Sequence, residues 1–354
     1  MPPKHRAAVI GCGGYARVHA QGYQRIEGVE LVAGADLNEE RARGFGEELS
    51  VGWYADWEQM VAEQRPDLIS ITTHHAAHAP LAIACAESVP GLRAITVEKP
   101  MAMNLGEADD MMAACDRRGI VLAVGHQRRF NIEWIEGRKL WEKGAIGDPL
   151  LIIGRWPAGN TQMYRYEVFG GGALPYLGSH TLDLMRFFCG DVEWVLAQVD
   201  LADPPVDVEK RTYAHLAFKS GVHGVLETGE GMEAGYYRGQ TITVYGTEGA
   251  VEMVDAVGTR WRCRDHPEWI PLELDMEKVE GHKSNLWGTF AMLQDVVKCA
   301  EEGGEPVCSA RNGRAALELC MAIYQSEGLG SRVDLPLREK QSPLKLLLAE
   351  RGRG

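Results

Sequence analysis

The chain has 354 residues, 45% of them hydrophobic and 25% charged, and a formal net charge of −13. This length suffices for two domains with a core each. The negative charge and the absence of a basic block argue against nucleic acid or an anionic membrane as the main partner. None of the eight cysteines forms a Cys-x-x-Cys pair, so neither a zinc site nor a disulfide framework is expected. No apolar run approaches the roughly 20 residues of a membrane span and no signal peptide is recognisable, so we expect a soluble, cytoplasmic protein.

The first informative feature is a glycine-rich turn, Gly-Cys-Gly-Gly-Tyr-Ala at 11–16, between an apolar strand at 7–11 and a helix-compatible segment. Gly11 permits a tight turn, Gly13 lets the backbone approach a pyrophosphate, and Ala16 keeps helix and strand close together. The helix N-terminus would offer N–H groups and a positive dipole end to phosphates. The turn therefore predicts a dinucleotide site.

An acid at the end of the next strand completes this pattern. The stretch 29–36 is typical of a second strand and ends at Asp36, twenty positions after Ala16. An acid there can accept hydrogen bonds from both ribose hydroxyls of an adenosine and repels a 2′-phosphate. The alternative is an ordinary solvated Asp that opens the following helix. We predict that NAD(H) is preferred over NADP(H).

The first third of the chain alternates short apolar strands with helices. This pattern predicts a parallel sheet covered on both faces, an α/β domain that binds ligands at the carboxyl ends of its strands. The sequences at 72–75 and 98–100 should then lie on the same rim as the glycine turn. The expected strands are 7–11, 29–36, 68–73, 95–98 and 120–124, and the expected helices are 39–49, 56–64, 80–88 and 105–118.

The pattern changes after the Gly-Asp-Pro sequence at 147–149. Successive strands separated by short turns predict a mainly antiparallel sheet. The expected strands are 150–156, 194–201, 212–219, 223–228, 241–245 and 250–254, with helices at 177–188, 285–302 and 311–326. We expect domains at 1–125 and 126–336, with the last helix able to pack back on the rest. The tail at 337–354 is expected to be a loosely held terminus or a contact to a partner chain.

Lys99 is the first candidate for proton transfer, because it follows the strand at 95–98. Beside a positively charged nicotinamide, like charge and desolvation would lower its pKa. A cis peptide bond before Pro100 would direct the ammonium inward. The alternative is a surface lysine that pairs with Glu98.

A second candidate group is formed by Tyr176, His180 and Asp183, which share one face if the segment is helical. Such a cluster can hydrogen-bond several sugar hydroxyls and relay a proton. The alternative is the polar face of an amphipathic helix, with a partly buried His180. Trp156, at the end of a strand, could pack on the apolar face of a sugar ring or anchor the core.

The histidines at 74, 75 and 78 lie as close together in the sequence as metal ligands often do, but no nearby carboxylate or cysteine completes a set of metal ligands. We expect them to line the ribose and nicotinamide edge of the cofactor, and Arg128 to bring a cation to the same rim. The expected cofactor contacts are Gly11, Gly13, Gly14, Tyr15, Ala16, Asp36, Leu37, Thr72, Thr73, His75, His78, Glu98, Lys99 and Gln127. The expected substrate contacts are Arg128, Trp156, Asn160, Tyr176, His180, Asp183, Tyr236 and Tyr237. No metal is expected.

Taken together, these motifs resemble the Gfo/Idh/MocA oxidoreductases over nearly the whole chain. The shared motifs are the glycine turn, the stretch from Thr72 to Pro80, Glu98-Lys99-Pro100, the Arg-Arg-Phe sequence at 128–130, the Gly-Gly-Gly-Ala-Leu run at 170–174, the sequence from Gly178 to Asp183 and the helix after Arg311.

The resemblance implies an N-terminal Rossmann domain and a C-terminal α+β domain with a large open sheet, whose outer face mediates dimers or tetramers in similar proteins. It implies that Lys99 is catalytic and that His180 relays a proton to or from a sugar or polyol hydroxyl. It also implies NAD(H) or NADP(H) as the cofactor, and we expect a homodimer or homotetramer.

The sequence departs from the family pattern at two points. Tyr176 stands where inositol dehydrogenase-like members have an aspartate, and Thr73-His74 replaces the usual Pro-Asn. Tyr176 could supply a phenol for proton transfer, with Lys99 as the cation that lowers its pKa, or it could only contact the sugar.

The leading hypothesis is an NAD-dependent dehydrogenase or reductase of a sugar or polyol. One alternative is a glycosidase or epimerase that uses bound NAD for transient redox without net oxidation. A second alternative is a regulator that senses the cofactor without catalysis.

Overall fold

The computed structural model describes residues 4–157, 164–202, 205–230, 239–276 and 281–350. Two compact units are formed, each from two stretches of the chain. The first unit contains Met1–Phe130 and Asn285–Arg314, and the second contains Asn131–Ser284 and Ala315–Gly354. We expected domain boundaries at 125/126 and 336/337. Whether the chain folds as separate parts with these boundaries stays a prediction.

The first unit is built on a six-stranded, wholly parallel sheet with the order β3-β2-β1-β4-β5-β6. The strands are β1 (His5–Ile10), β2 (Val29–Ala35), β3 (Gly52–Tyr54), β4 (Leu68–Ile71), β5 (Ala94–Val97) and β6 (Val121–Val124). The helices are α1 (Gly14–Tyr23), α2 (Glu39–Leu49), α3 (Trp57–Gln64), α4 (His78–Ser88), α5 (Leu105–Arg118) and α10 (Gly281–Glu302), with short turns η1 (His75–Ala77) and η2 (Gln127–Phe130). This architecture confirms the predicted α/β fold.

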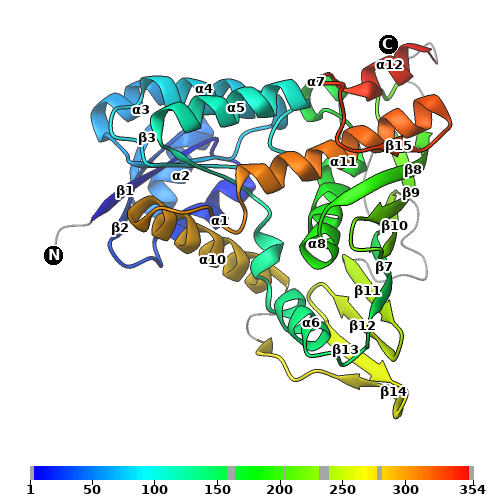
Figure 1. Ribbon diagram of the computed structural model, residues 1–354. Coiled ribbons are helices and arrows are strands. Elements are labelled where there is room, and N and C mark those ends of the chain that lie inside the picture. Colours follow the sequence, from blue (N-terminus) through cyan, green and yellow to red (C-terminus); the bar gives the residue numbers. More distant parts are fainter. Residues whose placement is uncertain (1–3, 158–163, 203–204, 231–238, 277–280, 351–354) are drawn as a thin grey trace. The chain divides into compact units, whose positions relative to one another are not determined.

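Helices cover both faces of this sheet, as Figure 1 shows. One core cluster joins side chains of β1, α1 and α2 with Met292, Leu293 and Val296 of α10. Because a parallel sheet is apolar on both faces, it needs such cover. The late helix α10 supplies part of it, although it lies more than 150 residues after β6.

The second unit is built on a nine-stranded sheet with the order β14-β13-β12-β11-β7-β10-β9-β8-β15. Its pairs are antiparallel except for β7 and β10, which confirms the mainly antiparallel prediction. The strands are β7 (Pro149–Trp156), β8 (Val192–Leu201), β9 (Glu209–Phe218), β10 (His223–Gly229), β11 (Thr241–Gly246), β12 (Gly249–Val254), β13 (Gly258–Cys263), β14 (His266–Pro271) and β15 (Val333–Asp334). The helices are α6 (Ile132–Glu142), α7 (Tyr166–Phe169), the π-helix η4 (Leu174–Gly178), α8 (Ser179–Cys189), α11 (Ala310–Leu329), which begins in the first unit, and α12 (Pro343–Glu350).

The structure corrects several expectations. The expected helix at 177–188 begins earlier, as a π-helix at Leu174. The strands β3, β13, β14 and β15 and the helices α6, α7 and α12 were not predicted. The tail is not loosely held as far as Glu350, because α12 buries Leu344, Leu347 and Leu348. Of the helices in the described ranges, none is long and apolar enough to cross a membrane.

Candidate functional site

The glycine turn lies at the end of β1 and is held by the loop after β4. The Thr72 hydroxyl donates to the Gly11 carbonyl oxygen at 2.6 Å, and the Thr72 N–H donates to Ile10 at 2.8 Å. Gly11 has a φ of +93°, and a Cβ there would lie 2.8 Å from the backbone nitrogen of Thr73. Only glycine fits this turn, because it combines a positive φ with close backbone contact.

The N-terminus of α1 has no side-chain cap, whereas those of α2, α3 and α5 have one. Asn38, Asp56 and Asn104 cap α2, α3 and α5 with side-chain hydrogen bonds. Helix α1 instead begins after Gly13, with no side-chain cap and no acid in its first turn. A Cβ on Gly13 would meet nothing within 4 Å. The first N–H groups of α1 can therefore bind an anion such as a pyrophosphate.

Asp36 follows β2 and contacts this turn directly. Its Oδ2 accepts a hydrogen bond from the Cys12 N–H at 2.9 Å, and its Oδ1 accepts one from the Asn38 N–H at 2.8 Å. Arg41 lies 3.9 Å from Oδ2. The neighbouring Leu37 side chain is 95% exposed, which leaves an apolar surface beside the acid. The structure thus brings Gly11, Gly13 and Asp36 together at one rim.

Lys99 follows β5 on the same rim, and its peptide bond to Pro100 is cis. Burial and the charge of Arg128 lower the pKa of Lys99, and the neighbouring Glu98 carboxylate raises it, which leaves the pKa at about 8. Arg128 belongs to η2 and is 5% exposed. An amine with this pKa exchanges protons near neutral pH, as a general acid or base requires.

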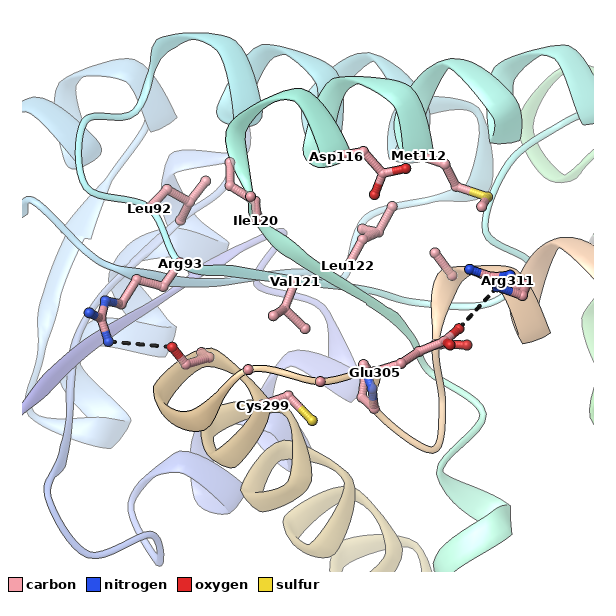
Figure 2. Close-up of a pocket in the computed structure, with 17 residues that line it drawn as sticks. Leu92, Arg93, Met112, Asp116, Ile120, Val121, Leu122, Cys299, Glu305 and Arg311 are labelled. Atoms are coloured by element: carbon pink, nitrogen blue, oxygen red, sulfur yellow. Dashed lines mark hydrogen bonds and ion pairs between the residues drawn. The ribbon is translucent and has the colours of Figure 1, made fainter.

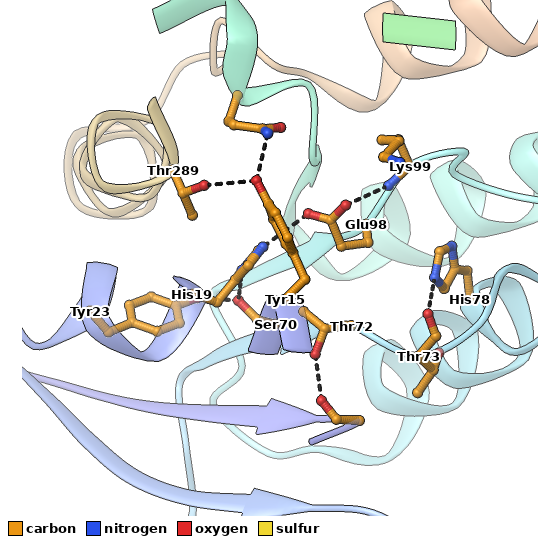
Figure 3. A network of polar contacts seen from close by, with 12 residues as sticks. Tyr15, His19, Tyr23, Ser70, Thr72, Thr73, His78, Glu98, Lys99 and Thr289 are labelled. Carbon is orange, nitrogen blue, oxygen red and sulfur yellow. Dashed lines mark hydrogen bonds and ion pairs between the residues drawn. The ribbon is translucent and has the colours of Figure 1, made fainter. Parts of the chain in front are cut away.

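Glu98 belongs to a buried polar network that sequence reasoning missed (Figure 3). His19 Nε2 lies 3.0 Å from Glu98 Oε1, and His19 Nδ1 lies 2.9 Å from Ser70 Oγ. His19 is 0% exposed, on the face of α1 that packs on the sheet. Its partners come from β4 and from the residue after β5, so no local pattern in the sequence identified it.

Tyr15, Gln127 and Thr289 form a second contact beside this network. The Tyr15 hydroxyl accepts a hydrogen bond from Gln127 Nε2 at 2.5 Å and lies 3.3 Å from Thr289 Oγ1 (Figure 3). Burial is the main cause that raises the pKa of Tyr15 above its usual range. Of the residues expected to contact the cofactor, Ala16 is fully buried and Gln127 is 3% exposed.

The histidines after β4 support the rim loops. His78 is 0% exposed, and its ring nitrogens lie 2.9 Å from the Pro100 carbonyl oxygen and 3.2 Å from that of Thr73. Burial lowers the pKa of His78. His75 is 4% exposed and its ring lies 5.7 Å from that of His78. In the described ranges, no three or more His, Cys, Asp or Glu side chains gather as a metal site.

In the second unit, the predicted cluster lies on the π-helix and α8. Tyr176 is 37% exposed, whereas His180 and Asp183 are 4% and 1% exposed. The His180 ring lies 5.9 Å from Trp156 at the end of β7, and the Tyr176 ring lies 5.2 Å from Tyr164. The segment therefore presents one exposed phenol and one largely buried imidazole. Asn160, Tyr236 and Tyr237 lie outside the described residues.

A buried carboxylate anchors this segment, and sequence reasoning missed it as well. Glu209 on β9 is 0% exposed and accepts hydrogen bonds from the Gly172 and Leu174 N–H groups at 2.8 and 2.7 Å. It also accepts one from the Tyr324 hydroxyl of α11 at 2.9 Å. Burial raises the pKa of Glu209 despite these donors.

A separate cavity of about 570 Å³ lies in the first unit near the amino ends of β5 and β6 (Figure 2). Its two arginines are engaged, since Arg93 donates to the Ala300 carbonyl oxygen and Arg311 pairs with Glu305. The glycine turn and Lys99 lie at the opposite, carboxyl ends of the strands. We therefore assign this cavity no part in the candidate site.

Two family models match the chain. Residues 5–126 match the "Oxidoreductase family, NAD-binding Rossmann fold" model, and residues 134–252 match the GFO/IDH/MocA C-terminal domain. The chain belongs to the GFO/IDH/MocA oxidoreductase family. The Rossmann fold of the first unit and the family resemblance predicted from the motifs are thereby confirmed, and the protein is an oxidoreductase.

Named relatives cover nearly the whole chain. It is 29% identical to a D-apiose dehydrogenase of Paraburkholderia graminis, over 96% of this chain and 92% of that protein. It is 30% identical to a myo-inositol 2-dehydrogenase of Thermotoga maritima, over 91% of this chain and 96% of that protein. A levoglucosan dehydrogenase in complex with NADH and levoglucosan has the same fold, with a TM-score of 0.84, 22% identity and coverage of 94% and 100%.

Proposed function

We propose that this oxidoreductase is an NAD(H)-dependent dehydrogenase or reductase that transfers a hydride between nicotinamide and a hydroxyl-bearing carbon of a sugar or polyol. The observation that carries the proposal is Lys99, an amine with a pKa of about 8 on the rim that bears the glycine turn. The named relatives that act on apiose, inositol and levoglucosan support this substrate class.

The residues at the rim fit NAD(H). The open N-terminus of α1 would bind the pyrophosphate, Asp36 would accept hydrogen bonds from the adenosine ribose, and the exposed Leu37 would pack against the adenine. The Asp36 charge favours NAD(H) over NADP(H), because it would repel the negatively charged 2′-phosphate of NADP(H). When bound, the cofactor accepts or supplies the hydride.

The protein side chains would move the accompanying proton. In oxidation, Lys99 in its neutral form would take the hydroxyl proton, and in reduction its ammonium would return one. His180 would relay that proton, as the family resemblance implies. The exposed Tyr176 would either contribute its phenol to this relay or contact the sugar ring, and Trp156, Asp183 and Arg128 would contact the substrate.

The test is NADH formation, followed by ultraviolet absorbance, with a panel of sugars, inositols and glycosides and with NAD and NADP compared. Catalytic NADH release with one of these compounds is the expected result. Consumption of a glycoside without NADH release would instead establish transient redox without net oxidation. Cofactor binding without any turnover would favour a regulator.

We also propose a homodimer or homotetramer that forms through the nine-stranded sheet. Leu196, Tyr213 and Tyr245 on this sheet are 36% to 44% exposed, and large apolar side chains of this kind favour contact with another surface. Sedimentation velocity measures the assembly. Replacement of Leu196 and Tyr213 by Lys should lower the measured mass, and an unchanged mass would place the contact elsewhere.

A further inference from the structure

A line of buried polar groups runs under the rim in the first unit and ends at the residue before Lys99 (Figure 3). The Tyr23 hydroxyl lies 2.9 Å from Ser70 Oγ, Ser70 Oγ lies 2.9 Å from His19 Nδ1, and His19 Nε2 lies 3.0 Å from Glu98 Oε1. Three of these groups are 0% to 2% exposed and Glu98 is 8% exposed. Because buried polar groups are almost always hydrogen-bonded, each contact in this line needs one donor and one acceptor. This requirement determines which ring nitrogens of His19 can carry a proton.

The direction of one hydrogen bond follows from chemistry. Glu98 is a carboxylate near neutral pH and only accepts, so His19 Nε2 must carry a proton and donate it. With a neutral ring, Nδ1 accepts from the Ser70 hydroxyl, which in turn accepts from Tyr23. With a charged ring, Nδ1 donates to Ser70. In both states His19 donates to Glu98.

The Glu98 carboxyl group is held from two sides. Oε1 accepts from His19, and Oε2 accepts from the Lys99 N–H at 3.3 Å. A Cβ on Gly125 would overlap the carboxyl, so glycine leaves the space that it fills. Burial raises the pKa of Glu98, but the hydrogen bond and charge of His19, together with the charges of Lys99 and His78, outweigh it and hold the pKa below its usual value.

We propose that His19 is a positioning residue for Lys99: it keeps Glu98 ionised and in place, and the Glu98 charge sets the pH range in which the Lys99 amine exchanges protons. The kinetic part of this proposal rests on the proposed function, whereas the contact between His19 and Glu98 does not.

The other charged and titratable groups around the pair come from neighbouring elements and remain in the variants below. Arg128 of η2 opposes the Lys99 charge, and His78 of α4 and Tyr15 of α1 interact electrostatically with Glu98. With these groups unchanged, a shift in the Lys99 titration reports on Glu98.

The experiment titrates Lys99 directly, by NMR of ¹³Cε-lysine in the full chain before NAD is added, with the signal assigned through Lys99→Met. In the parent protein we expect a pKa of about 8. Glu98→Gln removes the negative charge and should lower this pKa by about one unit, a tenfold change in the equilibrium. His19→Leu removes the hydrogen bond and charge that oppose the effect of burial on Glu98, so the pKa of Glu98 rises and the carboxyl becomes partly protonated. The pKa of Lys99 should therefore also fall, but by less than in Glu98→Gln.

Two variants separate positioning from packing. His19→Gln keeps an N–H donor for Glu98 and should return the Lys99 pKa towards the parent value. Tyr23→Phe removes the far hydroxyl of the same line, leaves the contact of His19 with Glu98 intact and should not move the Lys99 pKa. An unchanged Lys99 pKa in either His19→Leu or Glu98→Gln, or a shift in Tyr23→Phe equal to that in His19→Leu, would overturn the proposal.

A measurement on the parent protein keeps the test decisive if His19→Leu does not fold. ¹⁵N-histidine NMR should show His19 Nε2 protonated between about pH 5 and pH 8, the range in which an ordinary His changes its state. A deprotonated Nε2 would overturn the proposal. In turnover assays, the acidic limb of the kcat/KM profile should shift with the Lys99 pKa. If no substrate turns over, the proposed function fails while the NMR result still stands.

Discussion

Among single residues, Lys99 has the clearest expected effect on catalysis. Lys99→Met should reduce kcat by about 10²–10⁴-fold, the usual contribution of a general acid or base, while NAD binding persists. In the oxidation direction, the parent kcat/KM should rise with pH through about 8, because the neutral amine is the base. Steady-state kinetics over this pH range, with NAD affinity measured by calorimetry, checks both expectations.

The matched control for this change is Lys139→Met, in an exposed lysine of α6 that pairs with Glu136. It should leave kcat and its pH dependence unchanged. Full activity of Lys99→Met with bound NAD would remove Lys99 from the mechanism.

Asp36 governs the expected choice of cofactor. Asp36→Asn removes the negative charge but keeps an oxygen that can accept from the Cys12 N–H. We expect the ratio of kcat/KM with NAD to kcat/KM with NADP to fall about tenfold, because the repulsion of a 2′-phosphate is lost. Asp56→Asn, in the acid that caps α3, is the control and should leave the ratio unaltered. Unchanged selectivity in Asp36→Asn would refute the ribose contact.

At the level of elements, the π-helix depends on a buried acid. Glu209→Ala leaves three buried donors, the N–H groups of Gly172 and Leu174 and the Tyr324 hydroxyl, without their acceptor. Each such loss costs about 1–3 kcal/mol, so the free energy of unfolding should fall by about 3 kcal/mol or more. Urea denaturation followed by circular dichroism measures the change.

Glu209→Gln retains one carbonyl oxygen and should lose about half as much, while Glu193→Ala, in an exposed residue of β8, should lose almost nothing. Equal losses in Glu209→Ala and Glu193→Ala would show that Glu209 does not anchor the π-helix.

Elements with strong periodicity were predictable from the sequence, and short or irregular ones were not. The apolar strands β1, β2, β4, β5 and β6 stand out because a parallel sheet buries both faces. Strand β3 has only three residues, and β13 carries arginines that hide its alternation. The π-helix contains Pro175 and Gly178, residues that normally argue against a helix.

The same limit applies to the candidate site. The placement of Gly11, Asp36 and Lys99 on one rim could be predicted because each of them follows a strand. His19 and Glu209 could not, since each acquires its meaning from partners on distant elements, 79 residues away for His19 and Glu98 and 115 for Glu209 and Tyr324. Burial and pairing of this kind are properties of the tertiary structure.

At the scale of the whole molecule, the first unit is incomplete without the late segment. Met292, Leu293 and Val296 are 0% to 2% exposed in its core, and each contributes about 1.5–3 kcal/mol of burial. Their sum is comparable with the total stability of a typical domain. We therefore expect a fragment of residues 1–130 not to unfold cooperatively, and a fusion of 1–130 to 285–314 through a flexible linker to do so.

Thermal denaturation of the two fragments, followed by circular dichroism, checks this expectation. Cooperative unfolding of the 1–130 fragment alone would show that the first unit does not need α10, and would favour the domain boundary expected from the sequence at 125/126.

The hydrogen bond from the Cys12 N–H to Asp36 limits how the cofactor preference can evolve. In the proposed cofactor site, the carboxylate that would contact the ribose also holds the turn that would receive the pyrophosphate. A mutation to glycine or alanine at this position would relax selectivity and at once loosen the turn for either cofactor. We therefore expect relatives that use NADP(H) to carry asparagine or serine at this position, because both keep an acceptor for the Cys12 N–H, rather than glycine or alanine.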